Sequence, residues 1–196
     1  MIHLQCTHSV LKHLGVRPKD LRQADESDAL LGNWSVSNFV VDRRHAFLFM
    51  SDRTLLSFML LEGKMRFELS KVQGLLQGGL GQLLEFAQFP PAQIDSAVAG
   101  LDVIAVTRTK DRALLGNLTS LADEDQHRIH YSGGFAACDL TQITLSINNG
   151  PQRRLGWSSA FEMTRELLAS PHAARAQGGA GCPGPIGRFS LSRAIA

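Results

Sequence analysis

The sequence is poor in cysteine, and its few cysteines are spaced in a way that excludes two common small-protein frameworks. Cys6, Cys138 and Cys182 are the only three in 196 residues. They are odd in number and far apart, and no two of them form a Cys-x-x-Cys pair. This spacing argues against a disulfide-stapled secreted domain and against a zinc ribbon. We therefore expect a reducing, cytoplasmic location.

The chain also lacks an excess of charge of one sign and any long apolar run. Its 20 basic and 18 acidic residues give a formal net charge of +2, which is too balanced for a protein that coats nucleic acid non-specifically. No apolar stretch approaches the roughly 18 residues of a membrane span, and no cationic segment followed by an apolar core marks a signal peptide. We expect neither membrane insertion nor secretion, and any anion site must be local.

What is present is an ordinary globular composition, 44% hydrophobic and 19% charged, with a clear strand pattern. From Trp34 onward, short polar turns at residues 42–44 and 51–53 separate three apolar runs. This arrangement predicts an antiparallel meander. Short apolar segments over residues 1–5 and 102–107 predict further strands of the same sheet.

Helical spacing of apolar residues fills the remainder of the first 170 residues. The expected helices cover residues 7–15, 70–86, 91–101, 111–130 and 139–147, and a last one carries Phe161 and Leu168. The sequence thus predicts an α+β fold, an antiparallel or mixed four- to five-stranded sheet with helices mainly on one face. Residues 1–170 are expected to form a single domain, and the Gly-, Ala- and Pro-rich residues 171–196 a disordered tail.

Three cations stand where the 102–107 strand meets the next helix: Arg108, Lys110 and Arg112. A helix start exposes unpaired N–H groups, so cations there suit a phosphate or carboxylate ligand. The alternative is that Asp111 caps the helix while the cations face solvent or pair with acidic residues. The segment lacks the glycine spacing of a phosphate loop. The three cations are therefore the first candidate for an anion- or nucleic-acid-binding site.

Arg43 and Arg44 form a second basic patch at the tip of the first hairpin. Arginines on a two-stranded ribbon suit contacts with a nucleic-acid backbone, and Phe47 or Phe49 would stack a base if their face were exposed. Alternating aromatic and aliphatic residues on a central strand more often fill a core. Both interpretations stay open at this point.

A histidine-containing stretch near the end of the 111–130 helix offers a set of metal ligands. Glu124, His127 and His130 follow steps of three, so a carboxylate and two imidazoles would share a helix face. This predicts a divalent-metal site or a carboxylate-oriented histidine base, with a solvated helix end as the alternative. No motif in the chain predicts an organic cofactor.

Several segments together resemble an uncharacterised bacterial family. They are the Ile-x-Leu strand, the Thr7-started helix, the segment Leu30-Leu31-Gly32-Asn33-Trp34, the 42–44 hairpin, and Asp111-Arg112-Ala113-Leu114-Leu115-Gly116. The resemblance covers roughly residues 1–170. In that family the domain occurs alone and in larger proteins related to a plasmid open-reading-frame family, and no activity is assigned.

The chain departs from this family just after Gly116. Where the family usually shows Ser-Met-Asn-Asp, the chain has Asn117, Leu118, Thr119 and Ser120. The resemblance therefore implies a shared fold and no catalytic residue.

Together these observations predict a cytoplasmic, non-catalytic binding or accessory protein of a bacterial mobile-element or regulatory system. Its expected ligand is an anion or nucleic acid bound at a local basic site. One alternative is a metal-dependent hydrolase or nuclease that uses Glu124, His127 and His130. Another is a homo-oligomeric or partner-binding scaffold.

Overall fold

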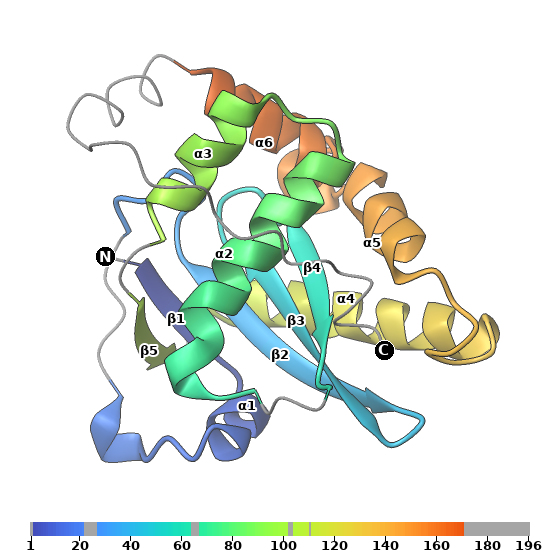
Figure 1. Ribbon diagram of the computed structural model, residues 1–196. Coiled ribbons are helices and arrows are strands. Elements are labelled where there is room, and N and C mark those ends of the chain that lie inside the picture. Colours follow the sequence, from blue (N-terminus) through green and yellow to red (C-terminus); the bar gives the residue numbers. More distant parts are fainter. Residues whose placement is uncertain (1, 22–26, 64–66, 102–103, 110, 171–196) are drawn as a thin grey trace.

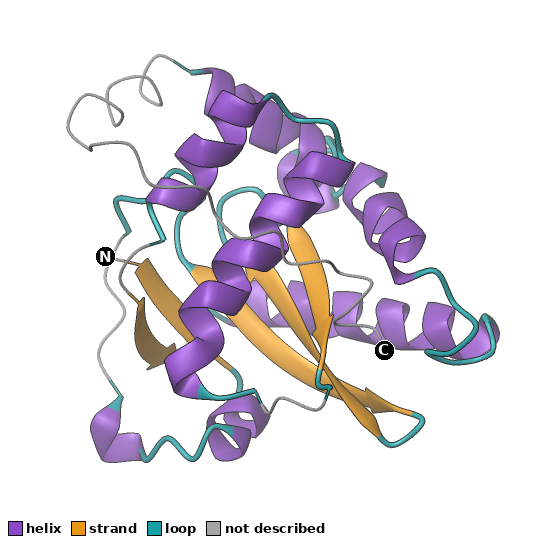
Figure 2. Cartoon of the chain, viewed as in Figure 1, coloured by secondary structure: helices purple, strands orange, loops and turns teal. Residues whose placement is uncertain are grey.

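A computed structural model of the chain describes residues 2–21, 27–63, 67–101, 104–109 and 111–170 (Figures 1 and 2). In chain order the elements are β1 (Ile2–Cys6), α1 (His8–His13), η1 (Pro18–Asp20), β2 (Trp34–Val41), β3 (Arg44–Ser51), β4 (Ser57–Leu61), α2 (Leu69–Phe86), α3 (Pro91–Ala99), β5 (Ile104–Arg108), α4 (Arg112–Tyr131), α5 (Leu140–Asn149), η2 (Arg153–Leu155) and α6 (Ala160–Ala169). Within these ranges no helix is long and apolar enough to cross a lipid bilayer. The expected tail at residues 171–196 lies outside the described residues.

The strands form one mixed sheet in the order β4-β3-β2-β1-β5. β2, β3 and β4 make the expected antiparallel meander, with Ala46 of β3 opposite Leu61 of β4. β1 runs parallel to both of its neighbours, β2 and β5. The sequence-based prediction of an α+β fold with a mixed sheet is therefore confirmed.

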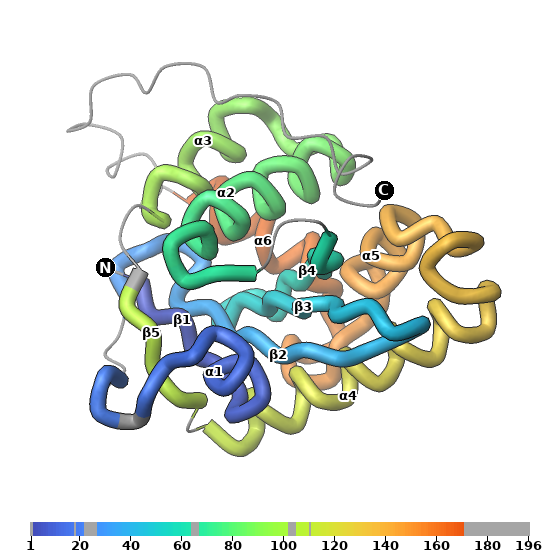
Figure 3. Tube along the Cα trace, turned by 60° about the horizontal axis from the view of Figure 1, so that its bottom comes forward, coloured from blue at the N-terminus to red at the C-terminus, as the bar shows by residue number. Residues whose placement is uncertain are grey.

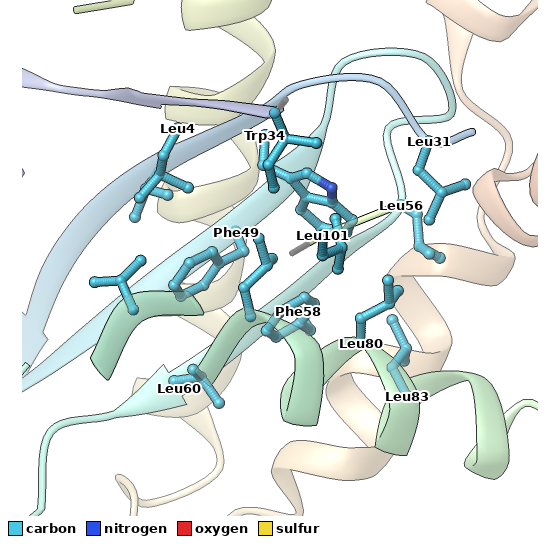
Figure 4. Packing of buried hydrophobic residues seen from close by; sticks show 14 of the residues in the cluster. Leu4, Leu31, Trp34, Phe49, Leu56, Phe58, Leu60, Leu80, Leu83 and Leu101 are labelled. Atoms are coloured by element: carbon cyan, nitrogen blue, oxygen red, sulfur yellow. The ribbon is translucent and has the colours of Figure 1, made fainter. Parts of the chain in front are cut away.

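Alternation along the strands divides the apolar side chains between two faces. On one face Phe58 stacks on Phe49, with 5.1 Å between ring centroids, and also contacts Trp34 beneath α2 (Figure 4). Helices α1, α3 and α6 add apolar side chains to this larger core. Helix α4 covers the opposite face, and α5 packs beside β4 (Figure 3). Most helices thus lie on one face of the sheet, and α4 lies on the other.

The hairpin between β2 and β3 turns on two residues, Asp42 and Arg43. Both are left-handed, with φ of 51° and 62°, as the central residues of a type I′ turn must be. The Asp42 carboxylate accepts a hydrogen bond of 3.2 Å from the backbone N–H of Phe135, in the loop after α4. The hairpin tip is therefore anchored to a distant part of the chain.

Helix α2 approaches the sheet most closely at Gly79. A β-carbon at this position would collide with the ring of Phe58, whereas one at Gly74 of the same helix would meet nothing within 4 Å. Gly79 is buried and Gly74 is exposed. The absence of a side chain at Gly79 lets the helix lie flat on the aromatic layer.

A carboxyl group is buried on the opposite side of the sheet, on α4. Asp125 is 2% exposed, and its Oδ1 has no hydrogen-bond partner among the described residues. Burial raises the pKa of Asp125 to about 8; the neighbouring Glu124 adds to the rise and Arg128 opposes it. Asp125 is therefore mainly neutral in the folded protein at pH 7.

The substitution Gly79→Ala should lower the free energy of unfolding by about 1–3 kcal/mol, because Phe58 or α2 must shift to admit the methyl group. Gly74→Ala, the matched control, should raise it by about 0.5–1 kcal/mol, since alanine favours the helix and meets no neighbour. Urea denaturation measures both values. Changes of the same sign at the two positions would contradict the close approach at Gly79.

The pKa of Asp125 predicts how stability depends on pH. The Asp125 carboxyl loses its proton at about pH 4 in the unfolded chain but only at about pH 8 in the folded protein. Between these two values the folded state binds one more proton than the unfolded state, so the free energy of unfolding should fall as pH rises. Asp125→Asn, neutral at every pH, should remove the part of this fall above about pH 6, whereas Asp123→Asn, exposed on the same helix, should keep it. Below about pH 6 a smaller fall should remain, because burial also raises the pKa of Asp52 to about 6. Denaturation curves between pH 5 and pH 8 test the assignment, and an equally steep fall in Asp125→Asn would refute it.

Candidate functional site

Two histidines and a glutamate from three separate parts of the chain meet at one end of the sheet. His13 ends α1, His45 lies near the start of β3, and Glu62 directly follows β4. In Figure 1 this is the lower end of the sheet, near α1. One ligand atom from each side chain lies within 4.8 Å of the other two, and no other such group of three is found among the described residues.

The strand register explains why His45 and Glu62 are neighbours. Ala46 lies opposite Leu61, so His45 and Glu62 are the next pair along, and the Glu62 amide donates a hydrogen bond of 2.8 Å to the His45 carbonyl. Residues directly opposite in antiparallel strands project their side chains from the same face. His13 reaches this face from α1, where its ring meets that of Phe47 edge-on with 5.0 Å between centroids.

Glu62 is the centre of the cluster. Its Oε1 lies 3.0 Å from Nε2 of His13 and accepts a hydrogen bond of 3.1 Å from the backbone N–H of Phe67. Burial raises the pKa of Glu62, but the hydrogen bonds from Phe67 and His13, together with the nearby His45 ring, outweigh it and hold the pKa below its usual value. Glu62 is therefore a carboxylate at neutral pH, which is the form that binds metal ions.

His45 brings an unsatisfied ring nitrogen to this cluster. Its Nδ1 is buried and has no hydrogen-bond partner among the described residues, and its ring centroid lies 5.2 Å from that of His13. A buried polar atom without a partner costs free energy, and such atoms are uncommon in folded proteins. The ring is thus suited to an external ligand such as a metal ion, which would satisfy this nitrogen.

The cluster opens onto a cleft of about 620 Å³, a volume within the range of small-molecule sites. Arg43 and Arg44 of the hairpin line this cleft together with the histidines and Glu62. Phe47 and Phe49, which would have stacked a base if exposed, are instead 1% and 0% exposed. The hairpin therefore borders the cleft with its two arginine residues and contributes its aromatic rings to the core.

The basic junction at the start of α4 has a different character. Asp111 caps the helix, accepting hydrogen bonds from the backbone N–H groups of Ala113 and Leu114 at 2.8 and 3.1 Å, and it also pairs with Arg154 at 3.3 Å. Arg108 and Arg112 are exposed, and Lys110 lies outside the described residues. The capping role of Asp111 is established, while an anion site at Arg108 and Arg112 stays a prediction.

The three metal-ligand candidates of α4 are not gathered around one point. Glu124 pairs with Arg128 at 2.7 Å, and Nδ1 of His127 lies 2.7 Å from the backbone carbonyl oxygen of Asp123. The His130 ring instead meets Tyr131, with 6.0 Å between centroids. A metal site on this helix stays a prediction without a preformed set of ligands.

Sequence reasoning missed His13 and Glu62, and it assigned no role to His45, which follows the two arginines of the turn. The two missed residues are 49 positions apart and belong to no recognisable motif. A signal was nevertheless present in the meander, because its two short turns determine which residues of the second and third strands lie opposite each other.

Comparison with known proteins places the chain in a family. No curated protein and no solved structure matches it. A family model described as "Domain of unknown function (DUF6933)" matches residues 3–163, which include His13, His45, Glu62 and the two hairpin arginines. This agrees with the resemblance to an uncharacterised family, whereas bacterial and mobile-element associations stay predictions. The chain therefore belongs to DUF6933, a family whose function is unknown.

Proposed function

We propose that the protein binds one divalent transition-metal ion through His13, His45 and Glu62. The observation that carries this proposal is the convergence of two imidazoles and one carboxylate within 4.8 Å. Mixed nitrogen and oxygen ligands suit Zn²⁺, Fe²⁺ and Co²⁺, whereas Mg²⁺ and Ca²⁺ prefer oxygen alone. A tetrahedral zinc site spaces its ligand atoms about 3.4 Å apart, so the side chains need only small rotations to close on one ion.

The surroundings of the three side chains favour a preorganised site. The Phe67 N–H fixes the Glu62 carboxylate, and the Phe67 ring stacks on Phe47 with 3.8 Å between centroids. Phe47 in turn holds the His13 ring edge-on. Supporting contacts of this kind orient ligands and strengthen metal binding, because less order has to be created when the ion arrives.

Three protein ligands leave at least one coordination position for an exchangeable group. Structural zinc sites usually have four protein ligands, so a site with three is of the type that presents its ion to water or to another molecule. The open side here would be the cleft lined by Arg43 and Arg44. A metal-dependent hydrolase or nuclease would hold an activated water at this open position. Such an enzyme and a non-catalytic binding protein would both need the metal ion bound here.

The full-length chain should bind one equivalent of Zn²⁺ or Co²⁺ in equilibrium dialysis followed by elemental analysis. His13→Ala and Glu62→Gln should each weaken binding by about 100-fold or more, since even the partners that merely orient ligands contribute about 10- to 100-fold. Saturating Zn²⁺ should raise the unfolding temperature of the wild-type chain, because the ion binds the folded state. Mg²⁺ should have no comparable effect.

Two controls separate this site from other histidines. His8→Ala changes an exposed residue of the same helix, and the double variant His127→Ala/His130→Ala removes the candidates on α4; both should bind metal as the wild-type chain does. Thermal unfolding of metal-free Glu62→Gln checks that it is folded. Absence of Zn²⁺ and Co²⁺ binding, or full loading of folded Glu62→Gln, would refute the proposal, and loss of binding in the double variant would move the site to α4.

A further inference from the structure

We infer that the metal ion takes a phosphate-class anion, inorganic phosphate or a small phosphate monoester, as its exchangeable ligand, and that Arg43 binds the same anion from the hairpin. This inference rests on the proposed metal site. It adds the chemical class of the ligand and a residue that contacts it. Three features of the cleft support it: its charge, the environment of each arginine, and its size.

The cleft has an excess of positive charge once a divalent ion is bound. Glu62 is the one anionic ligand in the proposed set, so the ion keeps part of its charge. Arg43 adds a further cation to the lining, whereas the guanidinium of Arg44 lies against Phe135 on the opposite face of the sheet. Glu68 also lines the cleft, but its carboxylate pairs with Lys71 at 3.1 Å. A small ligand with two negative charges is the best electrostatic match for this arrangement.

The two arginines differ in their surroundings. Cζ of Arg44 lies 5.9 Å above the centroid of the Phe135 ring, a cation–π contact that engages its guanidinium. Arg43 is exposed, and its side chain makes no hydrogen bond or ion pair with any described residue. Its backbone is nevertheless held in place, because the adjacent Asp42 is bonded to the Phe135 N–H. Arg43 therefore has a backbone held in place and a guanidinium that no described residue engages.

A phosphate dianion has enough oxygens to reach both groups at once. One oxygen would replace water on the metal ion, and two others would accept the paired hydrogen bonds of a guanidinium. The cleft of about 620 Å³ leaves room for the organic part of a small ester. A nucleic-acid strand would need a longer basic surface than this, and the net charge of the chain is only +2.

Isothermal titration of full-length protein tests the inference, with inorganic phosphate and adenosine 5′-monophosphate as separate probes. Zinc-loaded protein, freed of excess metal, should bind phosphate, and metal-free protein should bind it at least about tenfold more weakly. Arg43→Ala should keep its bound zinc but lose about tenfold or more in phosphate affinity. Arg112→Ala, the matched loss of an exposed arginine outside the cleft, should behave as the wild-type chain.

The outcomes distinguish this inference from the proposal on which it depends. If the wild-type chain binds no zinc, the proposed function fails and this inference fails with it. If zinc binds but phosphate affinity is unchanged by its removal or by Arg43→Ala, this inference alone is overturned. Loss of phosphate binding in Arg112→Ala would assign the anion to the α4 junction and also overturn it. Equal affinity for the two probes would agree with this inference and indicate that the phosphoryl group alone is recognised. Tighter binding of the monophosphate would also agree with it and indicate that the organic part contributes.

Discussion

The register of the β2–β3–β4 meander is the constraint on which both the core and the candidate site depend. Because side chains alternate along a strand, a slip of one residue would turn every side chain to the opposite face. Phe47 and Phe49 would leave the core beneath α2, and His45 would no longer share a face with Glu62. The turn at Asp42 and Arg43, with its two left-handed residues, therefore determines both the packing of the core beneath α2 and the pairing of His45 with Glu62.

Local patterns account for much of the fold, and contacts between distant segments account for the rest. The meander and the Asp111 cap are visible in short stretches of sequence. The pairing of His45 with Glu62 follows from the strand register, but no local signal places His13 of α1 over that face. On α4, spacing alone suggested a ligand set, yet Arg128, four residues after Glu124, is the better partner for that carboxylate.

The cluster also shows how a metal ion and a proton would compete. In the contact with Glu62, Nε2 of His13 is 3.0 Å from Oε1, and because a carboxylate only accepts hydrogen bonds, the imidazole supplies the hydrogen. A metal ion needs the lone pair of that nitrogen, so loading would replace the hydrogen by the ion. The Phe67 N–H would remain on the carboxylate in both states, and the aromatic support of His13 need not change.

The bond between Asp42 and the Phe135 N–H links the two faces of the sheet. Gly134 makes this bond sterically possible, because a β-carbon there would overlap the Asp42 carboxylate. Arg43 borders the cleft on one face, while Phe135 packs in the core beneath α4 on the other. The position of Arg43 at the cleft thus depends on Gly134, which is more than 90 residues away in the sequence. A substitution that displaces the loop after α4 would therefore also shift the backbone beside Arg43 at the cleft.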